Sequence, residues 1–306
     1  MNKKGIALLI TLLFIIAITL SIGIGLKQVK VASSEIQNEN FMLQTTIILD
    51  DVLKFLKTSK DLEKVASDNT GEALYMFLSQ SSFIPFEASD IKISLEIVSA
   101  RAKLNINAIV DINGSKSDVS IARIEALKVY LSNYNINEDY TNILLDVMGK
   151  VKEDMSYNSD IFYEKPYLFR DFVVSDTHLG EVNDFYMKTY HDNNLKNIDF
   201  EKLFSFNSNI KTAIDLNYAS AEVWELILGV DKLRAEELSF GSGSYTKLDE
   251  LGLSNHEKLM LDRFKTSYFE PHLDVNIEIM QNSNMAKIHF EYDIKNKKGS
   301  NFSYEI

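Results

Sequence analysis

The chain has 306 residues and contains no cysteine, which excludes a disulfide framework, thiolate catalysis and cysteine-ligated zinc. Its hydrophobic and charged fractions, 45% and 25%, are typical of a folded protein. The formal net charge of -12 disfavours a phosphate-binding surface.

The first 26 residues carry the strongest pattern in the chain. Lys3, Lys4 and Gly5 precede a run from Ile6 to Leu26 that contains no charged residue. A bilayer-spanning helix needs about 20 apolar residues, whereas the apolar core of a cleaved signal peptide is shorter. The run therefore predicts a transmembrane helix. The lysines before it predict a cytoplasmic N terminus, with the rest of the chain on the other side of the membrane.

The helix is expected to continue beyond the membrane segment, because no proline occurs before Pro85. Four apolar residues share one helical face in its second half: Leu49, Val52, Leu53 and Leu56. A single long helix is therefore predicted from about Ile6 to about Leu56. A second helical piece is predicted at residues 72–78.

Alternation of apolar and polar residues predicts strands on both sides of a long helical block. The first two strands cover residues 91–97 and 102–107, and the C-terminal strands cover residues 273–279, 288–294 and 302–306. Between them, helices are expected at residues 121–134, 138–151 and 182–190 and around Val223. The predicted fold class is α+β, an N-terminal transmembrane helix followed by an antiparallel sheet that a helical insertion interrupts.

Residues 214–251 resemble a helix-hairpin-helix unit of the SAM-like kind. The hairpin is Gly229-Val230-Asp231, in which Gly229 is expected to end one helix in the left-handed conformation and Asp231 to cap the next. Residues 246–249 and 254–257 both have the spacing of a capping box. Nucleic-acid-binding members of this class have glycine where Asp231 stands, and four glutamates surround this hairpin. Nucleic acid is therefore not expected as the ligand.

The join between Gly5 and Ile6 resembles the leader of type IV prepilins, which prepilin peptidase cleaves after the glycine. This resemblance implies that Gly5 and Ile6 form the processing site and that Ile6 becomes the N-methylated first residue. Most pilins carry a glutamate at the fifth mature position, which here is Ile10. Its absence resembles the minor pseudopilin K family of type II secretion (general secretion pathway protein K).

Two asparagine-containing segments extend this resemblance into the rest of the chain: Lys103-Leu104-Asn105-Ile106-Asn107 and Leu216-Asn217-Tyr218-Ala219-Ser220-Ala221-Glu222-Val223. In the family, a helical domain that opens after the first such segment and contains the second interrupts the pilin sheet. The implied organisation is a leader at residues 1–5, a transmembrane helix at 6–26, the first part of the pilin domain at 27–110, the insertion at 111–266 and the C-terminal strands at 267–306.

The resemblance implies a non-enzymatic subunit that initiates or caps a pseudopilus and so supports protein export. Its partners would be other minor pseudopilins, the major pseudopilin, prepilin peptidase and the membrane. It would be a single-pass protein of the inner membrane with a periplasmic globular part. Two alternatives are a DNA-uptake or type IV pilus minor pilin whose helix-hairpin-helix module binds DNA, and a plain membrane-anchored binding module.

No cofactor is expected apart from a possible calcium ion, which the family associates with an acidic segment. The stretch Asp146-Val147-Met148-Gly149 matches that segment only at its first acid. The candidate ligands are Asp146, Glu153, Asp154 and Asp160, and a solvated acidic loop is the alternative, because calcium takes about six to eight oxygen ligands. The five histidines have no paired zinc-ligand spacing, and the sequence contains no nucleophile elbow or phosphate loop. Catalysis is therefore not predicted.

Overall fold

The computed structural model describes residues 38–88, 91–111, 117–149, 156–240, 245–282 and 284–305. The predictions for the leader, the transmembrane helix, Gly5, Ile6 and Ile10 lie outside these ranges. Among the described residues, none of the helices combines the length and the hydropathy of a membrane span.

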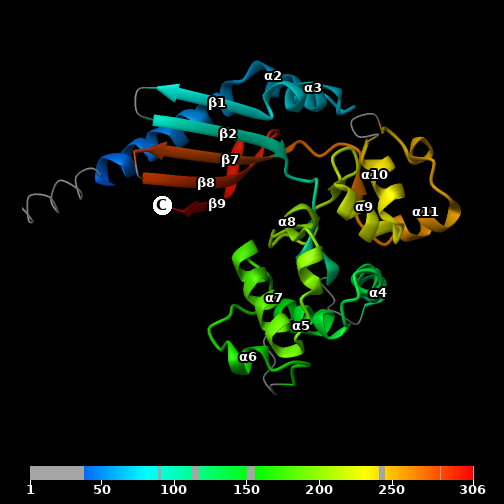
Figure 1. Cartoon of the computed structure of the whole chain (residues 1–306). Coiled ribbons are helices and arrows are strands. Elements are labelled where there is room, and N and C mark those ends of the chain that lie inside the picture. Colours follow the sequence, from blue (N-terminus) through cyan, green and yellow to red (C-terminus); the bar gives the residue numbers. More distant parts are fainter. Residues whose placement is uncertain are drawn as a thin grey trace, which may run out of the picture.

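A five-stranded antiparallel sheet forms one half of the molecule (Figure 1). Its strand order is β1 (Phe83–Ala88), β2 (Ile91–Ser99), β7 (His272–Gln281), β8 (Asn284–Asp293) and β9 (Lys298–Glu305). The pairing of β2 with β7 runs from Ile91 opposite Gln281 to Ser99 opposite Leu273. The chain therefore leaves the sheet and returns to it at the same end of two neighbouring strands.

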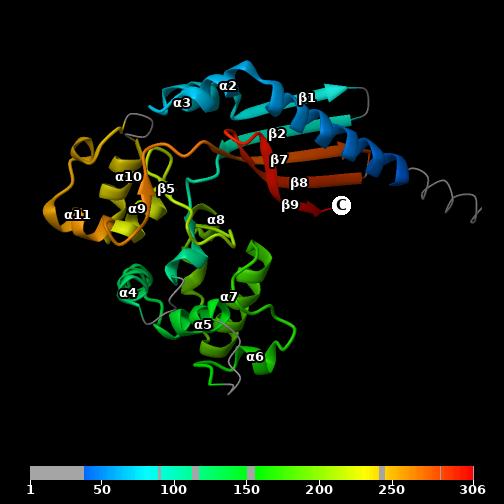
Figure 2. The same cartoon turned by 180° about the vertical axis from the view of Figure 1, so that it is seen from behind.

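An N-terminal helix, residues 38–58, crosses one face of the sheet (Figure 2). Leu49 and Leu56 are buried, and Val52 and Leu53 pack against the same cluster, which confirms the predicted apolar face. Two shorter helices, α2 (Lys60–Ser67) and α3 (Glu72–Ser81), add to this cluster. The second helical piece was thus predicted correctly, whereas α2 and β1 were not predicted.

Residues between β2 and β7 form a helical insertion (Figures 1 and 2). Its α-helices are α4 (Asp118–Asn133), α5 (Asp139–Met148), α6 (Ile161–Glu164), α7 (Asp176–Tyr190), α8 (Phe200–Leu203), α9 (Ala221–Leu228), α10 (Lys232–Phe240) and α11 (Asn255–Leu261). Short 3-10 helices cover Ile106–Ile109, Asn194–Asn197 and Leu248–Leu251. One hydrophobic cluster extends from Leu104 to Phe264, separate from the cluster beneath the sheet.

Two small parallel strand pairs lie inside the insertion. β3 (Leu104–Asn105) pairs with β4 (Phe204–Ser205), and β5 (Ile214–Asp215) pairs with β6 (Thr266–Ser267). The strand predicted at residues 102–107 is thus present only at Leu104–Asn105, outside the five-stranded sheet, because the chain turns into a 3-10 helix after Asn105. The alternation that suggested a strand has another cause, since Asn105 and Asn107 are buried rather than solvated.

Candidate functional site

Asp215 holds together the three segments that meet where the insertion joins the sheet. Its backbone N–H donates to the carbonyl of Arg101 at 2.8 Å. Its carboxylate accepts hydrogen bonds from the N–H of Asn217 at 3.0 Å and of Glu270 at 2.8 Å. The side chain is fully buried, and this burial raises its pKa to about 7. A protonation site therefore lies directly on the connection between the two halves of the molecule.

A buried ion pair lies at the same junction. The Arg101 guanidinium contacts the Glu291 carboxylate, and the two side chains are only 8% and 14% exposed. The amides of Asn207 and Asn301 donate to the same carboxylate at 3.2 and 3.3 Å. Glu291 lies on β8, so this pair ties the first residues after β2 to the sheet from which they depart. The sequence gives no sign of this pairing, because its partners are 190 residues apart.

Asparagines of the two motif segments are hydrogen-bonded in the interior of the insertion. Asn105 Nδ2 donates to the carbonyls of Asn207 and Asn209 at 2.9 and 3.1 Å. Asn107 Nδ2 donates to the carbonyl of Val173 at 2.9 Å, and its oxygen accepts from the N–H of Val173 at 2.8 Å. These asparagines therefore join loops to each other.

Asn217 has the same role in the second motif segment. Its Nδ2 donates to the carbonyls of Tyr245 and Tyr268, both at 2.8 Å, and its oxygen accepts from the N–H of Tyr245 at 2.9 Å. The asparagines of both motif segments thus form tertiary hydrogen bonds that hold the loops of the insertion together.

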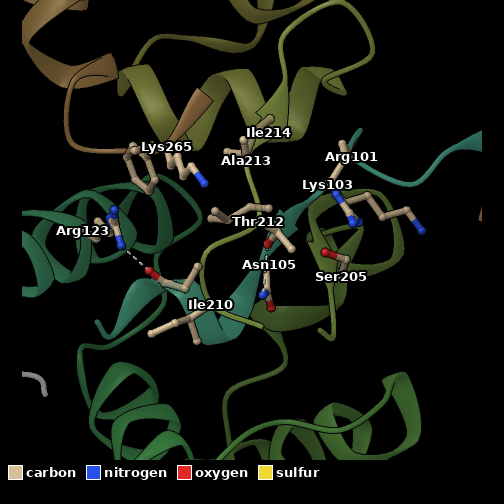
Figure 3. A pocket seen from close by; sticks show the side chains of 13 residues that line it. Arg101, Lys103, Asn105, Arg123, Ser205, Ile210, Thr212, Ala213, Ile214 and Lys265 are labelled. Atoms are coloured by element: carbon tan, nitrogen blue, oxygen red, sulfur yellow. Dashed lines mark hydrogen bonds between the residues drawn. The ribbon is translucent and has the colours of Figure 1, made fainter. Parts of the chain in front are cut away.

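A small cavity lies beside Asn105 and Thr212 (Figure 3). Its volume is about 20 Å³, and a single water needs roughly 10–15 Å³. Arg123 at its edge donates to the carbonyls of Ala108 and Arg263 at 2.6 and 2.7 Å. The cavity has room for about one water, so it is too small for an organic ligand.

A larger groove of about 570 Å³ separates the sheet from the insertion. On the sheet side it is lined by Asp274, His289, Glu291 and residues 301–305, and on the insertion side by residues 172, 174–177 and 204–208. His289 Nε2 lies 2.6 Å from Asp274 Oδ1, and this carboxylate raises the pKa of His289. The groove was not predicted, because its walls come from segments far apart in the sequence.

The hairpin forms as its residues indicate. Gly229 ends α9 with a φ of 64°, and the Asp231 carboxylate accepts from the N–H of Arg234 at 2.9 Å, which confirms both predicted caps. The Arg234 guanidinium lies 3.2 Å from Glu257 and 3.3 Å from Glu237. This positive charge is therefore balanced by two carboxylates, an arrangement that disfavours phosphate binding.

The predicted capping boxes behave differently from each other. The Ser254 to Glu257 box is present, with both reciprocal hydrogen bonds. The box predicted at residues 246–249 is wrong, because the backbone and side chain of Thr246 bond the carboxylate of Glu250 instead of reaching residue 249.

Asp146, the first candidate calcium ligand, is buried at the end of α5. Its carboxylate accepts from the backbone and side-chain nitrogens of Asn158 at 3.0 and 3.1 Å, and from the N–H and hydroxyl of Ser159, both at 2.8 Å. Asp160 is exposed, whereas Glu153 and Asp154 lie outside the described residues. Within the described ranges, no three acidic or histidine side chains come together as a metal cluster. Calcium binding stays a prediction, and the observed role of Asp146 is to anchor the loop before α6.

Replacing Asp146 with alanine is expected to lower the free energy of unfolding by about 2–4 kcal/mol, because four donors lose their buried acceptor. The matched control is Asp160→Ala, which is expected to change stability by less than about 0.5 kcal/mol. Urea unfolding of the full chain in detergent, followed by fluorescence of the single tryptophan, measures both. If calcium binds here, it will raise the midpoint of the wild type and not that of Asp146→Ala. Equal midpoints for the two variants would contradict the anchoring role.

No family model matches this sequence, and no curated protein matches it. A chain of the GspK-GspI-GspJ complex from the enterotoxigenic Escherichia coli type 2 secretion system is similar in structure, with a TM-score of 0.54. The match covers 88% of this chain and 97% of that chain, at 10% sequence identity. This chain has a GspK-like fold. The expectation of a pseudopilin K fold, made from short motifs, is thus confirmed for the fold as a whole.

Proposed function

We propose that this chain is a minor pseudopilin of a type II secretion machine and works by assembly rather than catalysis. The observation that carries the proposal is the GspK-like fold, which corresponds over 97% of the matched chain. The described helix, residues 38–58, follows the apolar run in the sequence and lies on the sheet, which is the pilin order.

The proposed subunit enters the inner membrane through residues 6–26 and holds its globular part in the periplasm. Its partners are other minor pseudopilins and the major pseudopilin, since the similar structure is itself a complex with GspI and GspJ. Met42, Leu43 and Ile47 lie on the solvent side of the N-terminal helix and are 52%, 61% and 51% exposed. Such a stripe supports packing against helices of neighbouring subunits. The bulk of the insertion supports a position at the start or cap of the filament.

The mature N terminus tests this proposal most directly. Intact mass and terminal peptide sequencing of protein from cells with prepilin peptidase should give a chain that starts at methylated Ile6, whereas cells without the peptidase should give a chain that starts at Met1. Gly5→Leu should abolish the cut, and Gly23→Leu, a matched change inside the apolar run, should leave it intact. A chain that starts at Met1 in every case would exclude the pseudopilin proposal and favour a plain membrane-anchored module.

A further inference from the structure

The two edges of the sheet differ in their capacity to accept another strand. β1 contains Pro85, which has no backbone N–H to donate, and proline is a common protection of edge strands. β9 contains no proline, and within the described residues its only strand neighbour is β8. A β-bulge between His289 and Glu291 interrupts that pairing without covering the outer edge of β9. The free edge of β9 is therefore the open side of the sheet.

The groove between the sheet and the insertion borders this edge. Its lining includes five consecutive residues of β9, 301–305. Successive residues of a strand point to opposite faces, so a continuous stretch of lining indicates that the strand's edge borders the groove. Ser303 and Glu305 pair with His289 and Lys287, which places both on the sheet face opposite the N-terminal helix. The groove therefore offers a backbone edge together with a solvent-accessible wall.

The opposite wall of the groove comes from the insertion and combines four apolar side chains, Phe172, Val174, Phe204 and Phe206, with polar ones. Phe172 and Phe206 are partly exposed, and Val174 is 42% exposed. Apolar side chains facing a free strand edge across a groove of about 570 Å³ are suited to hold the alternate side chains of an extended peptide.

The charge of the groove restricts the chemistry of such a peptide. Four acidic residues line it, namely Asp176, Asp274, Glu291 and Glu305, against Lys103 and His289. Asp274 lies against His289, and Glu291 is paired with Arg101, whereas Asp176 and Glu305 form no ion pair with any described residue. A basic peptide would place its charges near these two carboxylates, and an acidic one would meet repulsion.

We propose that the groove beside β9 is a docking site for an extended, basic segment of a partner protein, which adds to the sheet as a sixth strand. Backbone hydrogen bonds along β9 supply the affinity. The apolar side chains of the insertion wall and the exposed carboxylates of Asp176 and Glu305 select alternating apolar and basic side chains. This inference is independent of N-terminal processing, so either proposal can fail without the other.

The test uses the full chain in detergent and fluorescent peptides of about eight residues, a typical strand length. A peptide of alternating valine and lysine should bind saturably. Its counterpart with glutamate should not bind, and neither should a lysine peptide whose alternate backbone nitrogens are methylated. A photoreactive form of the lysine peptide should crosslink to residues of β9 or to residues 172–177. Fluorescence anisotropy and mass spectrometry of the crosslinked fragments supply the two measurements.

Charge variants separate the groove from the acidic surface in general. Asp176→Asn combined with Glu305→Lys should weaken binding of the lysine peptide by at least about tenfold, which equals 1.4 kcal/mol. The matched pair Asp61→Asn and Glu87→Lys makes the same charge change at exposed sites outside the groove and should leave binding unchanged.

Three results would overturn the proposal. The first is equal binding of the methylated and unmethylated peptides to the wild type, a comparison that does not depend on the variants folding. The second is a crosslink outside the groove, and the third is a dimer of this chain, detected by sedimentation, whose formation blocks the peptide.

Discussion

Replacing Arg101 with methionine is expected to lower the free energy of unfolding by about 3–5 kcal/mol, because it leaves the Glu291 carboxylate, only 14% exposed, without its cation. The amides of Asn207 and Asn301 still donate to that carboxylate, but neither carries a charge. The loss should appear in urea unfolding of the full chain followed by far-ultraviolet circular dichroism, which reports both the sheet and the insertion.

A second substitution, at Glu291, distinguishes the stability lost with the Arg101 contact from the stability lost by leaving a charge unpaired. Arg101→Met combined with Glu291→Gln removes both charges, so the double variant should be more stable than Arg101→Met alone. The control is Lys92→Met, whose partner Glu87 lies 3.8 Å away with both side chains more than 60% exposed. Exposed pairs contribute about 0–1 kcal/mol, so this control should unfold near the wild type. A double variant as unstable as the single variant would show that Arg101 acts through packing instead.

The strands that sequence predicts best are those with one buried and one solvated face. In β7, Leu273, Val275, Ile277 and Ile279 are all buried, as their alternation with polar residues predicts. The edge strand β1 was not predicted, because its apolar residues Phe83 and Phe86 are exposed and Pro85 argues against a strand. Alternation identifies a strand only where packing makes the two faces different.

Tertiary hydrogen bonds explain why the candidate site was less predictable than the fold. Asn105 and Asn107 alternate with apolar residues, as solvated strand positions would, yet both are buried. Asn105 is hydrogen-bonded to a loop 102 residues away and Asn107 to one 66 residues away. The Arg101 and Glu291 pair and the walls of the groove likewise depend on contacts that close only in the folded chain. Helix caps could be predicted, because the hydrogen bonds at Gly229 and Ser254 join residues only a few positions apart in the sequence.

The stability of the junction is expected to depend on pH through Asp215. Burial raises the pKa of this carboxyl from 3.8 to about 7 in the folded chain, with a further contribution from the nearby Glu270 carboxylate that two backbone N–H groups oppose. The folded state therefore favours the protonated form. The stabilisation is complete below pH 3.8, decreases as the pH rises and is lost above about pH 7. A shift of this size corresponds to about 4 kcal/mol.

Asp215→Asn isolates this effect, because an amide does not titrate in this range. Neighbouring groups titrate as well, and burial lowers the pKa of His272, which makes folding more favourable as the pH rises towards 6.5. The quantity to compare is thus the difference in unfolding free energy between the wild type and Asp215→Asn, measured in urea at pH 4, 6 and 8. Relative to the variant, the wild type should lose up to about 4 kcal/mol between the lowest and highest pH. Parallel curves would show that the folded chain holds Asp215 ionised throughout, and the junction would then depend on its two N–H donors rather than on its proton.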